Sequence, residues 1–261
     1  MKPRCPGAWI VTGAASGFGR EFAVRLARRG DALCLFDRDA DGLEATRSML
    51  PGAKVFTGVV DLADDDAFAR VVAEARDAVG PIGHCVHSAG VLSFGPVATA
   101  PVADFRRLME VNYLGSVKVA QAALPHLREA SSQGRAVMLF VASIAGLRAA
   151  PEVGGYSASK YAVVGLARAL RDEMLGTDVD VKALCPPAGD TPRLRAYETL
   201  PPIYKVTSKL SAQTIVGRCL DAIDEPGFEI LVDAQSRALI AANRLAPRLA
   251  EWVVAQVTSR R

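Results

Sequence analysis

The chain has 261 residues, of which 50% are hydrophobic and 23% are charged, and its formal net charge is +3. This length allows one large domain with a full core, and such a small, evenly spread charge argues against a nucleic-acid-binding surface. No stretch reaches the roughly 20 apolar residues of a membrane-spanning helix, and we expect no signal peptide because the N-terminal apolar run is short.

The cysteines are widely separated, and no two of them form a C-x-x-C pair. Several fall in or at the end of apolar runs, which predicts buried free thiols in a reducing compartment, and therefore a cytoplasmic protein. We expect no metal site, since no histidine ligand set accompanies them. The five cysteines are Cys5, Cys34, Cys85, Cys185 and Cys219.

Strand-like runs alternate with amphipathic segments along most of the chain, which is typical of parallel βαβ units. Seven strands are predicted, at 8–12, 32–36, 54–60, 84–89, 136–142, 179–185 and 228–232. Helices are predicted between them, at 17–29, 39–49, 64–79, 101–130, 154–175 and 211–224. The strands are continuously apolar, so we expect one α/β domain over residues 1–261, with helices on both faces of the sheet.

Two segments depart from this alternation. Residues 186–209 are rich in proline and too long for a routine connection, which predicts either a lid that binds substrate or a poorly ordered segment. Residues 236–257 have a helical pattern that breaks at Pro247. This C-terminal segment could pack on the core or on a partner, which we favour, or it could lie against a membrane surface.

The first predicted strand leads into the glycine-rich stretch TGAASGFGR (12–20), which opens the first predicted helix. Glycines allow a tight turn and let a pyrophosphate approach the backbone, while the N–H groups of the helix N-terminus bind its charge. A glycine-rich turn that binds nothing is the alternative, but the position between strand and helix favours a dinucleotide site. The residues expected there are Gly13, Ser16, Gly17, Phe18 and Gly19.

Acidic residues follow the second and third predicted strands. Asp37 could accept hydrogen bonds from an adenosine ribose and would repel a 2′-phosphate, which favours NAD over NADP. Arg38 keeps NADP open, because a guanidinium could pair with that phosphate. Asp61, followed by Leu62, is placed to contact the adenine amino group. A helix-capping or turn role is an open alternative for both acids.

Tyr156 and Lys160 are four residues apart in a predicted helix and therefore share one of its faces. The pair could be ordinary surface decoration. A phenol has a pKa of about 10, however, and a neighbouring cation favours its ionised form. Ser143 follows the fifth predicted strand, at the sheet edge where open α/β folds bind ligands, and its hydroxyl could donate to an oxygen that gains charge. Capping a turn is its alternative role, and Asn112 could simply satisfy backbone groups.

The order and spacing of these motifs resemble the short-chain dehydrogenase/reductase family over nearly the whole chain. The resemblance implies a single-domain, doubly wound, Rossmann-type fold with a seven-stranded parallel sheet. It also implies a nicotinamide cofactor and hydride transfer at a secondary alcohol or ketone. The matching segments are TGAASGFG (12–19), Asp61, SAG (88–90), Asn112, Ser143, YSASK (156–160) and PPAGDT (186–191).

The resemblance also implies roles for individual residues. Tyr156 would be the general acid and base, and Lys160 would lower its pKa and bind the nicotinamide ribose. Ser143 would orient the substrate carbonyl, Asn112 would link a proton relay, and Thr191 would contact the nicotinamide carboxamide. Further cofactor contacts are implied at Ser88, Ala89, Gly90 and Pro186.

Two departures from the family pattern accompany this match. The family usually has Asn-Asn-Ala-Gly where this chain has HSAG (87–90), so Ser88 lacks the reach of an amide. His87 is expected to be a hydrogen-bonded structural residue, not a catalytic base. Pro187 stands where a glycine is common and should stiffen the start of the following loop.

The substrate is expected to be an apolar small molecule. The stretch CPPAGDTPRL (185–194) resembles the 3-ketosphinganine reductase branch of the family, which implies a 3-keto or 3-hydroxy aliphatic chain; a steroid-like compound also fits. That branch usually uses NADPH, in conflict with Asp37, to which we give more weight.

Other readings of the sequence stay open. The alternatives to an NAD(P)-dependent oxidoreductase are an epimerase or dehydratase on the same fold and a non-catalytic dinucleotide sensor. The small and apolar residues of 101–130 and 154–175 predict a homodimer or homotetramer.

Overall fold

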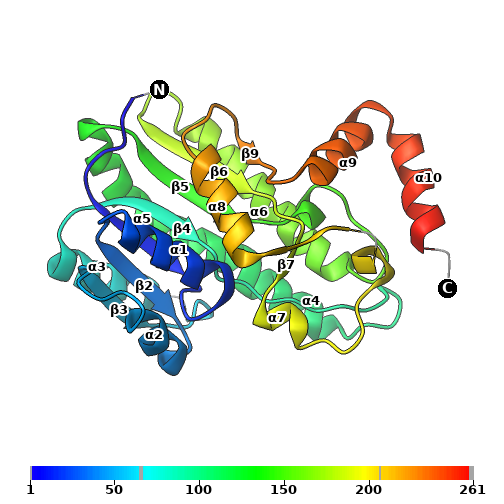
Figure 1. Ribbon diagram of the computed structural model, residues 1–261, viewed down its shortest axis with the longest axis horizontal. Helices are drawn as coiled ribbons and strands as arrows, with labels where there is room; N and C mark the ends of the chain where they lie inside the picture. Colours follow the sequence, from blue (N-terminus) through cyan, green and yellow to red (C-terminus); the bar gives the residue numbers. More distant parts are fainter. Residues whose placement is uncertain (1, 65–66, 206, 259–261) are drawn as a thin grey trace.

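The computed structural model describes residues 2–64, 67–205 and 207–258. Its centre is a parallel seven-stranded sheet between layers of helices (Figure 1), which confirms the predicted α/β doubly wound fold. The sheet order reverses next to β1, which creates a crevice at the carboxyl ends of the strands. From edge to edge the strands are β3 Val55–Val59, β2 Leu33–Asp37, β1 Ala8–Thr12, β4 Ile82–His87, β5 Ala136–Val141, β6 Val179–Leu184 and β9 Glu229–Ile230.

Two separate hydrophobic clusters hold the helices against the sheet, one on each face. One cluster joins the sheet to α3 Ala67–Val79, α5 Gly115–Ala130 and α6 Gly154–Glu173. The other joins it to α1 Gly17–Arg28, α2 Ala40–Arg47 and α8 Ala212–Ala222. Because each strand except β9 contributes apolar side chains to both clusters, these strands are buried on both sides, as their continuous apolar sequences predict.

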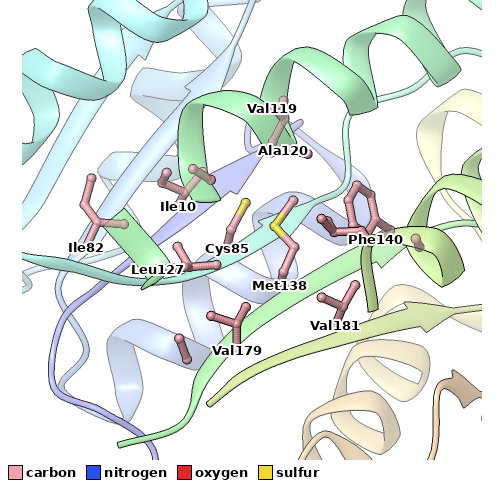
Figure 2. Packing of buried hydrophobic residues seen from close by; sticks show 14 of the residues in the cluster. Ile10, Ile82, Cys85, Val119, Ala120, Leu127, Met138, Phe140, Val179 and Val181 are labelled. Atoms are coloured by element: carbon pink, nitrogen blue, oxygen red, sulfur yellow. The ribbon is translucent and has the colours of Figure 1, made fainter. Parts of the chain in front are cut away.

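The α5 side of the sheet shows how this burial is achieved (Figure 2). Cys85 and Met138 lie side by side on adjacent strands and are fully buried, while Val119 and Leu127 of α5 cover them. Complete burial of a side chain of this size contributes roughly 1.5–3 kcal/mol to stability. All five cysteines are free and buried, as predicted.

Side-chain caps fix where several helices begin. Asp39 accepts a hydrogen bond from Gly42 N (3.0 Å) at the start of α2, and Ser211 accepts one from Thr214 N (3.1 Å) at the start of α8. Each cap satisfies a backbone donor that has no partner within its helix.

The predicted strand at 84–89 was wrong in its bounds, because β4 runs from Ile82 to His87. The backbone N–H groups of Ser88 and Ala89 donate to Thr12 Oγ1 at 3.1 and 3.2 Å instead of continuing the ladder. The chain therefore leaves the sheet two residues earlier than the apolar pattern indicates.

The single helix predicted at 101–130 was also wrong. It is divided into α4 Val102–Leu108, a π-helical turn at Met109–Leu114, and α5. Such widened turns are rare and often occur at functional sites. The helix predicted at 64–79 begins at Ala67 in the structure, and residues 65 and 66 lie outside the described residues.

The proline-rich segment 186–209 contains regular structure, so the alternative of a poorly ordered segment was wrong. Its short strand β7 Ala188–Asp190 pairs in parallel with β8 Lys209–Ser211. Thr191 caps the following helix, α7 Pro192–Arg195, where proline occupies a favoured first position. A 3₁₀ turn follows at Pro202–Lys205.

Two helices end the described chain, α9 Ala234–Leu245 and α10 Pro247–Thr258, and the break at Pro247 is as predicted. They lie beyond the β9 edge of the sheet (Figure 1), where α10 packs against α9 and the 3₁₀ turn at 202–205. Val254 is buried, whereas Leu245 and Trp252 are exposed. Among the described residues, the helices are all too short or too polar to cross a membrane.

Candidate active site

Two neighbouring cavities open at the carboxyl ends of the central strands. The first, which we name the Ser143 cavity, includes these predicted residues among its lining: Phe18, Ser143, Tyr156, Pro186 and Thr191. The second, the Asp37 cavity, includes Gly13, Asp37, Arg38, Asp61, Leu62, Ala89 and Gly90. Arg193 of α7 lines both cavities, so the predicted cofactor and substrate residues converge on one continuous region.

Ser143 and Tyr156 meet in the Ser143 cavity. Ser143 caps the 3₁₀ turn Ile144–Gly146 by accepting from Ala145 N (3.1 Å), so its capping role is real. Burial raises the pKa of Tyr156, whereas a hydrogen bond with Ser143 and the positive charge of Arg193 lower it. The phenol is therefore protonated near neutral pH, beside a hydroxyl that stabilises its anion.

Lys160 lies one turn after Tyr156 on the same face of α6, with Nζ 5.9 Å from the centre of the tyrosine ring. Its Nζ donates to the carbonyl of Val141 (2.9 Å). Burial lowers the pKa of Lys160 to about 7, and the charge of Arg193 acts in the same direction. The cation that acts on the phenol here is Arg193, a residue that the sequence analysis missed.

Asn112 lies in the π-helical turn and uses its whole amide to fix its surroundings. Its Oδ1 accepts from Val91 N (2.7 Å), while Nδ2 donates to the Val91 carbonyl (3.0 Å) and to Ser159 Oγ (2.9 Å). These bonds join the chain after β4 to α6, next to Lys160. The alternative role of satisfying backbone groups is therefore present, and the partner Ser159 was not predicted.

The glycine-rich turn forms a cradle between β1 and α1. Gly13 and Gly17 have φ values of 69° and 55°, which favour glycine. A Cβ at Gly13 would lie 2.8 Å from Ala89 N, and one at Gly19 would collide with the Gly13 carbonyl. A Cβ at Gly17 would lie 3.5 Å from the methyl group of Thr191, so Thr191 is next to the start of α1.

The start of α1 leaves backbone donors available. Ser16 is the N-cap residue, but its side chain makes no capping hydrogen bond, and the first turn contains no acidic residue. An N-terminus of this kind attracts anions through free N–H groups and the helix dipole. The cradle therefore fits the pyrophosphate of a dinucleotide.

The acids of the Asp37 cavity also hold backbone groups. Asp37 accepts from Ala15 N (3.0 Å) and from Asp39 N (3.2 Å), which fixes its carboxylate between the glycine turn and α2. Asp61 accepts from Ala63 N (2.9 Å), so the alternative turn role of this acid is also present. Each carboxylate oxygen has further acceptor capacity for a nucleoside.

His87 is the hydrogen-bonded structural residue that was predicted. Its Nδ1 lies 2.7 Å from Thr12 Oγ1, the oxygen that also accepts from the two residues after β4. Burial lowers the pKa of His87 to about 3, and the charge of Lys160 contributes. Thr12, which was not singled out in the sequence, thus braces β1 against the end of β4.

Aromatic side chains connect segment 186–209 to the chain that follows β4. The ring of Phe94 lies 4.7 Å from that of Tyr197 and 5.3 Å from that of Tyr204, between ring centres. Tyr197 also donates to the carbonyl of Leu92 (2.6 Å). Because Leu92 and Tyr204 line the Ser143 cavity, these contacts close one side of it.

The fold and the site together define a Rossmann-type, dinucleotide-binding oxidoreductase. The family model described as short chain dehydrogenase matches residues 8–199. The chain belongs to the short-chain dehydrogenase family, and the predicted class, an NAD(P)-dependent dehydrogenase or reductase that acts on CH–OH groups, is confirmed.

Known proteins of this family align with most of the chain. A 1-deoxy-11-beta-hydroxypentalenate dehydrogenase of Streptomyces exfoliatus is 34% identical over 237 residues, which cover 88% of this chain and 84% of that protein. A 3-dehydrosphinganine reductase of Arabidopsis thaliana is 27% identical over 253 residues, covering 94% and 76%. The crystal structure of a short-chain dehydrogenase/reductase of Burkholderia phymatum with NAD has a TM-score of 0.82 at 26% identity, covering 94% and 95%.

Proposed function

We propose that the protein is an NAD-dependent oxidoreductase that transfers a hydride between nicotinamide and the secondary alcohol or ketone carbon of an apolar small molecule. The observation that carries this proposal is that the hydroxyl-bearing side chains of Ser143 and Tyr156 line the same cavity, whose lining is mostly apolar. The two named relatives act on a hydroxypentalenate and a dehydrosphinganine respectively, and both names support chemistry at a hydroxyl or keto group.

The roles of the catalytic residues follow from this pair. When bound, the nicotinamide supplies the hydride acceptor for oxidation or the hydride donor for reduction. Ser143 donates a hydrogen bond to the substrate oxygen, and Tyr156 gives a proton to that oxygen in reduction or receives it in oxidation. Lys160 holds the nicotinamide ribose, while Asn112 keeps α6 and the chain after β4 in register.

The dinucleotide would lie along the two cavities. Gly13, Ser16, Gly17 and Gly19 would hold the pyrophosphate through backbone N–H groups, while Asp37 would accept from the adenosine ribose. The nicotinamide end would lie near Thr191. Other proposed contacts are Phe18, Arg38, Asp61, Leu62, Ser88, Ala89, Gly90 and Pro186.

The preference for NAD is supported by the fixed carboxylate of Asp37, which would repel a 2′-phosphate. Titration of wild type with NAD and NADP should show tighter binding of NAD. We expect Asp37→Ala to reduce the difference and Arg38→Ala to weaken NADP further, because the arginine is the available phosphate partner. Tighter binding of NADP by wild type would contradict the choice of cofactor.

The catalytic assignment is tested by Tyr156→Phe, which removes the proton-transferring oxygen and keeps the ring. We expect kcat for NADH formation from hydrophobic secondary alcohols to fall by roughly 10²- to 10⁴-fold. Tyr161→Phe is the matched control, because Tyr161 is exposed on the same helix and should leave kcat unchanged. Equal activity of wild type and Tyr156→Phe would reject the mechanism. Conversion of a nucleotide sugar without net NADH change would favour the epimerase alternative.

Self-association through α5 and α6 forms part of the proposal. The exposed side chain of Tyr161 on α6, and that of Leu114 just before α5, leave apolar surface on these helices. A homodimer or homotetramer would cover this surface. Sedimentation showing only monomer at micromolar concentration would contradict it.

A further inference from the structure

The Ser143 cavity contains positive charge without a compensating acid. Its lining includes Arg148 and Arg193, whereas no aspartate or glutamate lines it among the described residues. Most of the remaining lining is apolar, for example Leu92, Val153 and Leu239. A guanidinium in such surroundings interacts strongly with an anion, because little water screens it.

Arg148 is positioned by the same turn that positions Ser143. Its backbone N–H donates to the carbonyl of Ile144 (2.9 Å), which places Arg148 directly after the 3₁₀ turn that Ser143 caps. Arg148 thus lines the same cavity as Ser143, at a position that the hydrogen bond to Ile144 fixes.

The guanidinium of Arg148 is only partly satisfied by the protein. Its Nη1 donates to the carbonyl of Ala149 (2.6 Å), while Nε is buried and has no hydrogen-bond acceptor among the described residues. Nη2 likewise makes no hydrogen bond to the described residues. Nε and Nη2 form one edge of the planar guanidinium, and this edge matches the two oxygens of a carboxylate.

In Arg195 of helix α7, the corresponding edge of the guanidinium, Nε and Nη2, is fully hydrogen-bonded. Its Nε and Nη2 bind the two carboxylate oxygens of Asp190 at 2.7 and 2.8 Å. The second arginine of the cavity, Arg193, also lines the Asp37 cavity and interacts electrostatically with the carboxylate of Asp37. Arg148 forms no ion pair with a carboxylate of the described residues, so its charge is available to a ligand in the cavity.

We propose that Arg148 binds a carboxylate of the substrate, so that the substrate class is an apolar secondary alcohol or ketone that also carries a carboxylic acid. This inference rests on the proposed function, because it assigns a second anchoring point to the same cavity. Ser143 and Tyr156 hold the reacting oxygen, and Arg148 holds the acid at the far side of an apolar spacer. The hydrocarbon part contacts the apolar lining between them.

Equilibrium binding tests the anchor without requiring turnover. Decanoate and 1-decanol are titrated by calorimetry into the NAD-saturated wild type and into Arg148→Met, which keeps the length of the side chain without its charge. We expect wild type to bind decanoate about 10- to 100-fold more tightly than Arg148→Met does, with 1-decanol binding changed less than about twofold. Arg106→Met, at an exposed position of α4, is the matched control and should bind decanoate as wild type does.

Turnover tests the same anchor during catalysis. For 9-hydroxydecanoate and its methyl ester, we expect wild type to favour the acid in kcat/KM and Arg148→Met to lose that preference. Arg148→Lys should keep part of it, which also gives a folded variant if Arg148→Met is unstable. Equal decanoate affinity in wild type and Arg148→Met, or no preference for the acid over the ester in wild type, would overturn the inference.

The failure of this inference and the failure of the proposed function give different results. If wild type oxidises 2-decanol with NAD and Tyr156→Phe does not, the proposed function stands whatever happens at Arg148. If decanoate binding depends on Arg148 but neither 2-decanol nor 9-hydroxydecanoate is oxidised, the carboxylate site stands and the proposed function is rejected.

Discussion

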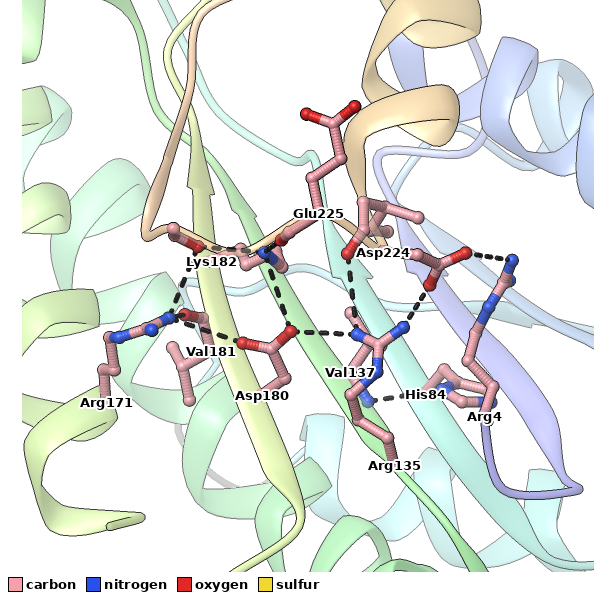
Figure 3. A network of polar contacts seen from close by, with 12 residues as sticks. Arg4, His84, Arg135, Val137, Arg171, Asp180, Val181, Lys182, Asp224 and Glu225 are labelled. Atoms are coloured by element: carbon pink, nitrogen blue, oxygen red, sulfur yellow. Dashed lines mark hydrogen bonds and ion pairs between the residues drawn. The ribbon is translucent and has the colours of Figure 1, made fainter. Parts of the chain in front are cut away.

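The two ends of the central sheet treat buried charge in opposite ways. At the amino end, Arg135 binds Asp180 (2.8 Å) and Asp224, and the other charges of this network also have partners (Figure 3). Nε of Arg135 lacks an acceptor, but both of its terminal nitrogens are occupied. At the carboxyl end, Nε of Arg148 is buried without an acceptor among the described residues, and Nε2 of the neutral His87 also lacks a partner there.

Two buried lysines make this difference concrete. Lys182, at the amino end, donates to the carbonyls of Glu225 (2.6 Å) and Gly227 (2.9 Å) and lies 3.6 Å from the carboxylate of Asp180. Burial lowers the pKa of Lys182, but Asp180 opposes that shift. Lys160 has a single carbonyl partner and, in the described chain, no carboxylate partner, so burial lowers its pKa to about 7. Paired charges hold the fold together, whereas unpaired ones are available for ligands.

The largest effect on stability is expected from disrupting the ion pairs around Arg135 at the amino end of the sheet. Arg135→Met removes the nearest of the cations that surround Asp180 and should lower the free energy of unfolding by about 3 kcal/mol, because the buried contacts of Arg135 with Asp180 and Asp224 are lost together. Lys2→Met is the control, since its ion pair with Asp178 is exposed and contributes under about 1 kcal/mol. Urea denaturation measures both. A cost for Arg135→Met no larger than that of the control would show that this network is not important for stability.

At the carboxyl end, substitutions should change catalysis more than stability. Ser143→Ala should lower kcat for alcohol oxidation by roughly 10²-fold, because a donor to the reacting oxygen is lost. It should also raise the pKa of Tyr156, since the Ser143 hydrogen bond lowers that pKa. The pH profile of kcat/KM for oxidation, measured in wild type and variant, should therefore move to higher pH.

Arg193→Gln separates the two influences on Tyr156. The charge of Arg193 also lowers the pKa of the phenol, but by less than the hydrogen bond of Ser143 does. This variant should therefore move the pH profile in the same direction by a smaller amount. A shift to lower pH in either variant would contradict the assigned electrostatics.

Lys160→Met tests whether the buried lysine at the carboxyl end of the sheet destabilises the fold, through the pH dependence of stability. The unfolded lysine binds a proton up to its ordinary pKa near 10.5, whereas the folded one loses it near pH 7. Between these two pH values the unfolded state binds more protons, so the stability of wild type rises with pH, and the destabilising effect of Lys160 is largest at and below pH 7. Lys160→Met should therefore be more stable than wild type at pH 7, by on the order of 2 kcal/mol. That advantage should shrink as the pH rises to 10. Urea denaturation at both pH values measures it, and an advantage that grows with pH would contradict the sign.

Local sequence patterns predict the sheet and its edges well but not the contacts between distant segments. The apolar runs predict every strand of the large sheet because burial on both faces needs continuous apolar residues, and the glycine spacing predicts the cradle. The early end of β4 depends on Thr12, more than seventy residues away, whose hydroxyl takes backbone donors from the ladder. No local pattern reports such a bond.

The candidate site shows the same limit. Tyr156, Lys160 and Ser143 follow from spacing and resemblance, and the structure brings them together. Arg193 and Arg148 were missed because a lone arginine in a loop is ordinarily a solvated residue. Only the folding of segment 186–209 over the sheet reveals that Arg193 faces both cavities. The π-helical turn at Asn112 has no sequence signal that we recognise.

The smallest predicted effect compares two helix N-termini. Ser211 caps α8 through a bond to Thr214 N (3.1 Å), whereas Ser16 starts α1 without a side-chain cap. Ser211→Ala should lower the free energy of unfolding by about 1 kcal/mol, and Ser16→Ala by less than about 0.5 kcal/mol, since no cap is lost. Thermal or urea unfolding of the two variants without cofactor measures the difference.

The same pair shows whether the start of α1 is open for a ligand. If the Ser16 hydroxyl, which caps nothing, donates to the pyrophosphate beside the N–H groups at the start of α1, Ser16→Ala should weaken NAD binding a few-fold although it hardly changes stability. Ser211→Ala should lower stability and leave NAD binding unchanged. Equal stability costs for both substitutions would mean that the Ser16 side chain caps α1 after all. The cradle would then have fewer free N–H donors, and the start of α1 would resemble the capped start of α8 and not an open ligand site.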